Sequence, residues 1–296
     1  MKTRAQRWHN FKEHLRFKYA PRIVDWLLDK STNRAKAWIR AHGKLRILVD
    51  NTVLHHAVTH ETGWVSTGTS NWGPLEIGTG YSARIPVHPT DPASREYQNV
   101  CFLPGLAHLM RMGLVTIYTS AELKDEQFRQ PSGRYHGYGY FDYNLFGDLQ
   151  IESIDGHVFP TMGPSYMNLP SAEDQQRARI LQHRSDKLFD ALVQCLGIKN
   201  SQDAWHIHTA EKHGLFCFLT MDFKLIRTVE AQARATPVRS LTTKVLTPEQ
   251  LAQSIGLMRF PPHLFSYHDA SFFVRSDLSM PEGKRRPLKN YKRDRA

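Results

Sequence analysis

Short apolar runs alternate along this chain with stretches of helical periodicity. The runs cover residues 45–50, 114–119 and 215–220, and a shorter one covers residues 244–246. Runs of this length are typical of buried strands, and strands separated by helices form mainly parallel sheets, because each helical crossover returns the chain to the same edge. The pattern predicts a three-layer α/β/α fold with a central, mainly parallel sheet.

Helical stretches fill the intervals between these runs. Residues 5–42 show helical spacing with a break at 31–33, and residues 94–112 show it with a break at Pro104. A long helix is predicted from Ser171 to Leu196, because Ser171 is a capping residue and two acids follow it. Further helices are predicted at 203–213, at 223–233 and after Thr247, which begins a capping box with Pro and Gln.

Two segments do not fit this alternation and are predicted to be insertions. Residues 63–93 are rich in Gly, Ser, Thr and Pro, and residues 131–170 hold tyrosines and phenylalanines among glycines. Within the second segment, Asp155-Gly156 predicts a short hairpin. We therefore expect an N-terminal helical extension over 1–44, a central domain over 45–257 and a C-terminal extension over 258–296.

The net charge of +11 is concentrated at the two ends of the chain. Residues 1–44 carry 12 Lys/Arg against 3 Asp/Glu, and residues 284–296 carry 7 against 1. Of the totals of 39 and 28, this leaves 20 basic and 24 acidic residues for the centre. Basic ends around a slightly acidic centre favour nucleic acid as the partner, with a cation held at the centre. The basic tail, which includes Lys284, Arg285 and Arg286, is equally well interpreted as a solvated extension.

Cysteine content and hydropathy bear on the compartment. Cys101, Cys195 and Cys217 are far apart and lie in apolar surroundings, which favours reduced core residues over disulfides or a zinc site. No apolar stretch approaches the roughly 18 residues that span a bilayer, and the first residues lack the apolar core of a secretory signal. We expect a cytoplasmic protein without a membrane partner.

Four acidic residues stand beside predicted strand ends or helix starts. Asp50 closes the first strand, Glu122 follows the second, Asp203 opens a helix, and Asp222 lies two residues beyond the third strand. Because parallel strands end at one edge of a sheet, these carboxylates can converge, and converging carboxylates are costly to ionise without a cation. The pattern predicts a divalent-metal site, although each acid taken singly is also explained as a turn former or a first-turn helix residue.

These acids lie in motifs that resemble those of PIN-domain nucleases. In residues 203–225, an Asp-Ala pair opens a helix, Gly214 ends it, a strand follows, and a Thr-x-Asp turn supplies Asp222, as in the family's third and fourth acidic motifs. Residues 47–54 are similar to the family's first strand and acid, residues 120–123 to its second motif, and residues 245–251 to its closing strand and helix. The chain departs from the family at Asn51, where Ser or Thr is usual, and in both insertions and both basic ends.

The resemblance implies a PIN-like nuclease domain over 45–257 that binds Mg²⁺ or Mn²⁺ through Asp50, Glu122, Asp203 and Asp222. Such a site hydrolyses phosphodiester bonds, in RNA rather than DNA and as an endonuclease by analogy with the family. The candidates for orienting ligands or water are Asn51, Thr52 and Thr220.

Several alternatives stay open. A non-catalytic nucleic-acid-binding or assembly protein could retain the same fold, and the chain could form a homo-oligomer or bind an inhibitory protein. A haloacid-dehalogenase-type phosphatase is disfavoured, because it would need an acid where Thr52 stands.

Basic and aromatic residues near the second insertion are candidates for nucleic-acid contact. Arg129 and Arg134 could hold phosphates, and Tyr135 and Tyr138 could stack on unpaired bases, although packing within a folded insertion explains the tyrosines as well. The histidines at 206 and 208 are expected to be structural or surface residues, because residues two apart on a helix face different directions. The adjacent histidines at 55–56 could touch phosphate, but surface or packing roles are favoured.

Overall fold

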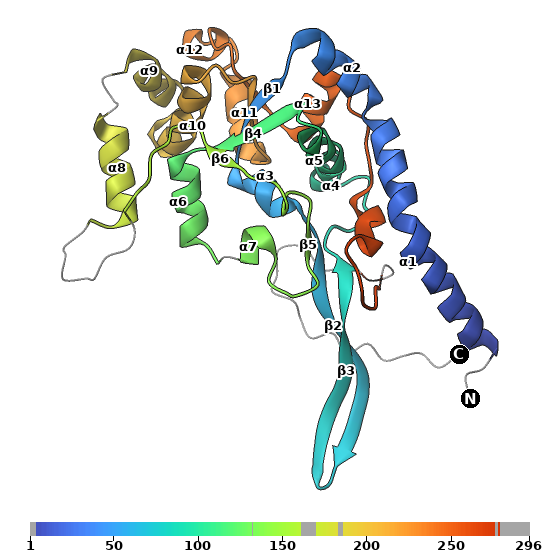
Figure 1. The fold of residues 1–296 in the computed structure, drawn as a ribbon. Helices are drawn as coiled ribbons and strands as arrows, with labels where there is room; N and C mark the ends of the chain where they lie inside the picture. Colours follow the sequence, from blue (N-terminus) through green and yellow to red (C-terminus); the bar gives the residue numbers. More distant parts are fainter. Residues whose placement is uncertain (1–3, 132, 161–169, 183–185, 276–277, 279–296) are drawn as a thin grey trace.

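A five-stranded parallel sheet lies at the centre of the computed structural model, which describes residues 4–131, 133–160, 170–182, 186–275 and 278 (Figure 1). The strand order is β6-β4-β1-β7-β8, and each pairing is parallel. The strands are β1 (Leu45–Val49), β4 (Val115–Thr119), β6 (Glu152–Ser153), β7 (Cys217–Leu219) and β8 (Lys244–Leu246). The predicted α/β fold with a central parallel sheet is confirmed.

The two faces of this sheet pack against different helices, because successive side chains of a strand point to opposite faces. Ile47 and Val49 of β1 belong to one apolar cluster, and Leu48 belongs to another. The first cluster includes side chains of α1 (Arg4–Ser31), α2 (Asn33–His42), α3 (Asn51–His56), α5 (Leu103–Arg111) and α13 (Pro248–Ile255). The second includes side chains of α6 (Ala121–Arg129), α9 (Lys187–Leu196), α10 (Ser201–Lys212) and α11 (Phe223–Ala231). This division is compatible with three layers.

The remaining helices are α4 (Arg95–Val100), α7 (Gly133–His136), α8 (Ala172–Gln182), α12 (Thr236–Arg239), and the 3₁₀ helices η3 (Ile198–Asn200) and η4 (Pro262–Tyr267). No helix among the described residues is long and apolar enough to cross a membrane.

Several local predictions are confirmed. Helix α1 ends at Ser31 and α2 begins at Asn33, so the helix is interrupted at the position where the helical spacing of the sequence is interrupted. The predicted capping box at Thr247 is present, since its hydroxyl accepts from the Gln250 amide and the Gln250 side chain accepts from the Thr247 amide. Gly214 has a φ of +59°, the left-handed conformation expected of a residue that ends a helix.

Two other local predictions are wrong. No hairpin forms at Asp155-Gly156 in the described residues, because Glu152 and Ser153 pair in parallel with β4 and extend the central sheet. The long helix predicted from Ser171 to Leu196 is divided into α8 and α9, and residues 183–185 between them lie outside the described residues. Asp186 begins α9 by accepting hydrogen bonds from the Leu188 and Phe189 amides, a capping signal that the helical spacing concealed.

The two predicted insertions differ in how they relate to the core. Most of the first forms a long hairpin of β2 (Val58–Trp72) and β3 (Leu75–Pro86), which projects from the molecule (Figure 1), and residues 67–78 are exposed. The second supplies β5 (Tyr143–Asn144), which pairs with the base of β2, and it places the fully buried Leu145 in the core. The second segment is therefore part of the body of the fold.

Candidate active site

Asp50 lies where β1 ends and α3 begins, at the carboxyl edge of the sheet. Its Oδ2 accepts hydrogen bonds from the Thr52 hydroxyl at 2.5 Å and from the Thr220 hydroxyl at 2.6 Å. These hydroxyls in turn accept from the backbone amides of Met221 and Asp222, at 3.0 and 2.9 Å. The turn after β7 thereby fixes the orientation of a carboxylate on β1. Both threonines, which the sequence analysis proposes as orienting residues, thus hydrogen-bond Asp50.

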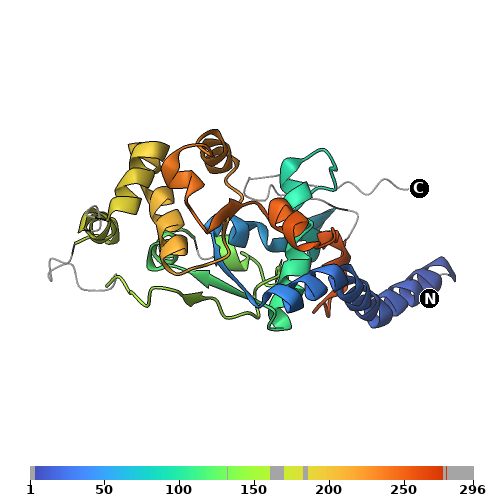
Figure 2. The ribbon, with the colours of Figure 1, turned by 90° about the horizontal axis from the view of Figure 1, so that it is seen from above.

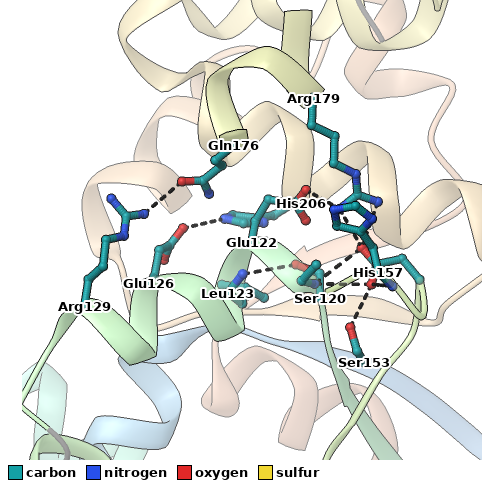
Figure 3. A network of polar contacts seen from close by, with 12 residues as sticks. Ser120, Glu122, Leu123, Glu126, Arg129, Ser153, His157, Gln176, Arg179 and His206 are labelled. Carbon is teal, nitrogen blue, oxygen red and sulfur yellow. Dashed lines mark hydrogen bonds and ion pairs between the residues drawn. The ribbon is translucent and has the colours of Figure 1, made fainter. Parts of the chain in front are cut away.

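Glu122 does not join Asp50, contrary to the prediction. Its carboxylate is fully buried, and Arg179 of α8 donates to Oε1 at 2.6 Å while also contacting Asp155 at 3.2 Å. Figure 3 shows this contact beneath α8. A carboxylate neutralised by a guanidinium is a poor candidate for a metal ligand, so we remove Glu122 from the candidate site.

Glu126, one turn further along α6, lies beside Asp50 instead. The Asn51 amide donates to its Oε2 at 3.0 Å, and Gln202 donates to its Oε1. His206 Nε2 lies 3.4 Å from Oε1 (Figure 3). Burial alone would raise the pKa of Glu126, but the hydrogen bonds from these three side chains outweigh burial and lower it. The carboxylate is thus held ionised. Asn51, which the sequence analysis proposes as an orienting residue, hydrogen-bonds Glu126 in this way.

Asp203 lies in the first turn of α10 and lines the same cleft. Burial raises its pKa to about 6, and the negative charges of Asp50, Asp222 and Glu126 act in the same direction. Asp222 begins α11, where its Oδ1 accepts from the Lys224 and Leu225 amides at 2.7 and 3.2 Å. One oxygen of Asp222 therefore caps α11, and Asp222 is not among the residues that line the cleft.

His206 is a member of the site that the sequence did not reveal. The imidazole is 3% exposed and stands among Glu126, Asp50 and Asp203. Burial would lower its pKa, yet the three carboxylates together raise it to about 9. At neutral pH His206 is therefore a cation. It partly balances the acidic cluster, whereas His208 pairs with Asp186 at 3.0 Å on another side of α10.

The side chains at this edge of the sheet line a cleft of about 550 Å³. Asp50, Glu126 and Asp203 form its acidic part, and basic residues surround them. Its lining residues are Asp50, Asn51, Thr52, His55, His56, Glu126, Arg129, Gln130, Arg134, Tyr135, Lys199, Gln202, Asp203 and His206. A negative centre with a positive surround suits a cation and a phosphate diester bound together.

The predicted nucleic-acid residues have different positions. Arg129, Arg134 and Tyr135 line the cleft, but Arg129 is also tied to Asp125 at 3.1 Å and to Gln176 at 2.8 Å. Tyr138 is exposed and does not line the cleft. The basic tail residues Lys284, Arg285 and Arg286 lie outside the described residues. Lys199 is a further cation at the cleft that the sequence analysis missed.

The chemistry of this donor set fits a divalent cation of the Mg²⁺ type. Hard carboxylate oxygens are the preferred ligands of such an ion. Burial raises the pKa of Asp50, although the hydrogen bonds from Thr220 and Thr52 oppose this shift. Within the described residues, no three His, Cys, Asp or Glu side chains are arranged closely enough to hold an ion as they stand. Contacts through water, which Mg²⁺ retains readily, are therefore part of any fit.

Comparisons of the chain with protein families, with curated proteins and with solved structures found no match.

Proposed function

We propose that the protein is a divalent-metal-dependent nuclease with a PIN-like fold, acting as an endoribonuclease. One observation carries the proposal: Asp50, Glu126 and Asp203 come from three separate elements and line one cleft, with Asp222 near enough to shift the pKa of Asp203. Carboxylates that converge in this way at the carboxyl edge of a parallel sheet are typical of a catalytic metal site. The preference for RNA rests on the sequence resemblance.

In this proposal Asp50, Glu126 and Asp203 would hold Mg²⁺ or Mn²⁺, directly or through water, and Asp222 would contribute from the turn after β7. The bound ion would neutralise phosphate charge and lower the pKa of a water molecule. Thr52 and Thr220 keep the Asp50 carboxylate aimed into the cleft. Arg134 and Lys199 would attract the phosphates flanking the bond to be cut. Water is the nucleophile, and no protein side chain forms a covalent intermediate.

The test is a titration of Mg²⁺ and Mn²⁺ against single-stranded RNA, structured RNA and DNA, with the product ends mapped. Asp50→Asn and Asp203→Asn should each abolish metal-dependent cleavage while leaving RNA binding in place. Asp190→Asn is the matched control, because Asp190 lies on α9, away from the cleft, and its carboxylate accepts a hydrogen bond from the Gln194 side chain. Cleavage that survives both cleft substitutions, or that is absent from the unsubstituted protein, would refute the nuclease proposal.

A non-catalytic nucleic-acid-binding or assembly protein is the second candidate. The observation that favours it is the cationic His206, which already compensates part of the charge of the acidic cluster. Under this alternative RNA would bind without metal, and none of the substrates would be cut with either ion present.

A further inference from the structure

Helix α1 presents two different faces. One face packs on the body through the buried Val24 and Leu28, and through Phe17, whose ring meets that of Tyr267 edge-on at 5.2 Å. The opposite face carries exposed side chains, among them Trp8 and Trp26, and in Figures 1 and 2 α1 runs along the periphery with its N-terminal end projecting beyond the body. With 28 residues the helix is about 42 Å long, so this outward face is extensive.

The outward face carries an apolar stripe. Its residues recur at intervals of three or four, as residues on one side of a helix do. They are Trp8, Phe11, Leu15, Tyr19, Ile23 and Trp26, with Leu27 beside them, and each is between 37% and 60% exposed. A contiguous exposed stripe of this size is unusual on a helix that faces only water, and it marks an interaction surface.

The charges of α1 are divided between the same two faces. All three acids are paired with residues close to the body: Glu13 accepts from the Tyr267 hydroxyl, Asp25 contacts His268, and Asp29 contacts Lys36 and His108. Arg16 also donates to Glu13 at 2.6 Å. The other exposed cations of the helix flank the apolar stripe, and they are Arg4, Arg7, Lys12, Lys18, Arg22 and Lys30. Lys12 and Lys18 lie over the rings of Trp8 and Tyr19, each 5.3 Å from the ring centroid. The outward face is therefore both apolar and strongly positive.

We propose that the outward face of α1 binds the surface of an anionic lipid bilayer, with the helix lying in the plane of the headgroups. Tryptophan and tyrosine favour the interface, aliphatic side chains such as Leu15 and Ile23 favour the acyl boundary, and flanking lysines and arginines are attracted to anionic headgroups. The helix lies on the bilayer and does not cross it. This inference replaces the expectation that the protein has no membrane partner, and it is independent of the proposed nuclease function.

Two other occupants fit the same face less well. A second copy would bring the exposed cations that flank the stripe of one α1 close to those of the other, and like charges at an interface oppose association. Nucleic acid would satisfy the cations and stack on the aromatic rings, but it would leave Leu15, Ile23 and Leu27 against phosphate or water. Only a surface that is both apolar and anionic complements the stripe and its flanks.

The experiment measures binding of the full-length protein to vesicles of phosphatidylcholine alone and of phosphatidylcholine mixed with phosphatidylglycerol. We expect binding to the mixed vesicles, weakened by salt because the cations contribute to it. Leu15→Gln combined with Ile23→Gln should reduce the affinity about tenfold or more, and Lys18→Gln and Arg22→Gln should each reduce it roughly fivefold. Glutamine is used because it preserves helix propensity at these exposed positions.

The matched control is Met112→Gln combined with Val158→Gln, which removes two exposed apolar side chains elsewhere and should leave vesicle binding unchanged. Circular dichroism and thermal unfolding of every variant show that the fold is retained. Absence of binding to the mixed vesicles, or equal binding by the Leu15/Ile23 variant, overturns the proposal. Two further results overturn it if the unsubstituted protein does not bind the mixed vesicles. If the unsubstituted protein is a dimer and the Leu15/Ile23 variant is not, the stripe binds a second copy. If the variant instead loses RNA binding, the stripe binds nucleic acid.

Discussion

The Thr220 hydroxyl donates a 2.6 Å hydrogen bond to Asp50 Oδ2 across 170 positions of sequence. This bond joins the ends of β1 and β7, neighbouring strands of the sheet, and it sets the direction in which the Asp50 carboxylate points. Thr220 is fully buried, and its oxygen also accepts from the Asp222 amide. The same hydroxyl therefore connects two of the acids in the candidate site.

Replacing Thr220 by Val tests this connection. The substitution keeps the shape of the side chain but removes the donor to Asp50, so we expect metal-dependent cleavage to fall by about tenfold to a hundredfold. The metal concentration needed for half-maximal activity should rise with it. Thr69→Val on the exposed hairpin is the matched control. An unchanged metal titration for Thr220→Val would show that the hydroxyl does not orient a ligand.

Glu122 and Glu126 should respond differently to replacement by Gln. Glu126→Gln should abolish cleavage, because it removes a carboxylate from the cleft, and it should also cost some stability, because a neutral amide is a weaker partner for Asn51, Gln202 and His206. Glu122→Gln breaks a buried ion pair with Arg179, so we expect the free energy of unfolding to fall by about 2–3 kcal/mol. The cleavage rate per folded molecule should be retained. Denaturant unfolding and single-turnover cleavage measure the two effects, and the reverse pattern would restore Glu122 to the site.

His206 should make stability depend on pH above neutrality. Its pKa in the folded protein is raised from 6.5 to about 9, so the folded state binds the proton more tightly than the unfolded state. The resulting stability is fully present below pH 6.5 and is lost as the pH rises through about 9. We expect a loss of about 1–3 kcal/mol between these limits in the protein, and a smaller loss in His206→Gln. Urea unfolding at pH 6 and at pH 9 provides the comparison, and equal losses in both proteins would contradict the assignment.

The basic side chains at the cleft should contribute to substrate binding more than to the chemical step. Arg134→Ala and Lys199→Ala should each raise KM by about fivefold to tenfold with a smaller change in kcat, because the positive charge attracts phosphates in the substrate and in the transition state alike. Each should also reduce the dependence of binding on salt concentration. Arg177→Ala is the control, since Arg177 is exposed on α8 and paired with Glu173. A fall in kcat at constant KM would place the side chain at the reacting group instead.

Local signals predicted much of the fold. The break at residues 31–33, the capping box at Thr247 and the strands that precede Asp50 and Asp222 depend on neighbours in sequence, and all are present in the structure. The short β6 was missed, because two residues have no periodicity to detect and their pairing with β4 is a tertiary contact. The hairpin expected at Asp155-Gly156 was the wrong inference drawn from the same segment.

The acids of the candidate site could be predicted only as far as the element that carries each of them. Glu122 and Glu126 lie one turn apart on α6, so helical spacing places both on the same side and does not distinguish them. Arg179 of α8 pairs with Glu122 in the first turn of α6, whereas Glu126 in the second turn lines the cleft. His206 likewise became recognisable only when three distant carboxylates were found around it.

By itself, the sequence determined the strands β1, β4, β7 and β8, the strand ends at which Asp50 and Asp222 stand, and the excess of positive charge near the N-terminus. These properties arise from residues a few positions apart, through periodicity, capping and composition. Only the tertiary structure decided which glutamate faces the cleft and which side of α1 remains outside the core. Both sides of α1 carry apolar residues, and the choice between them comes from packing against α5 and η4, segments far away in the chain.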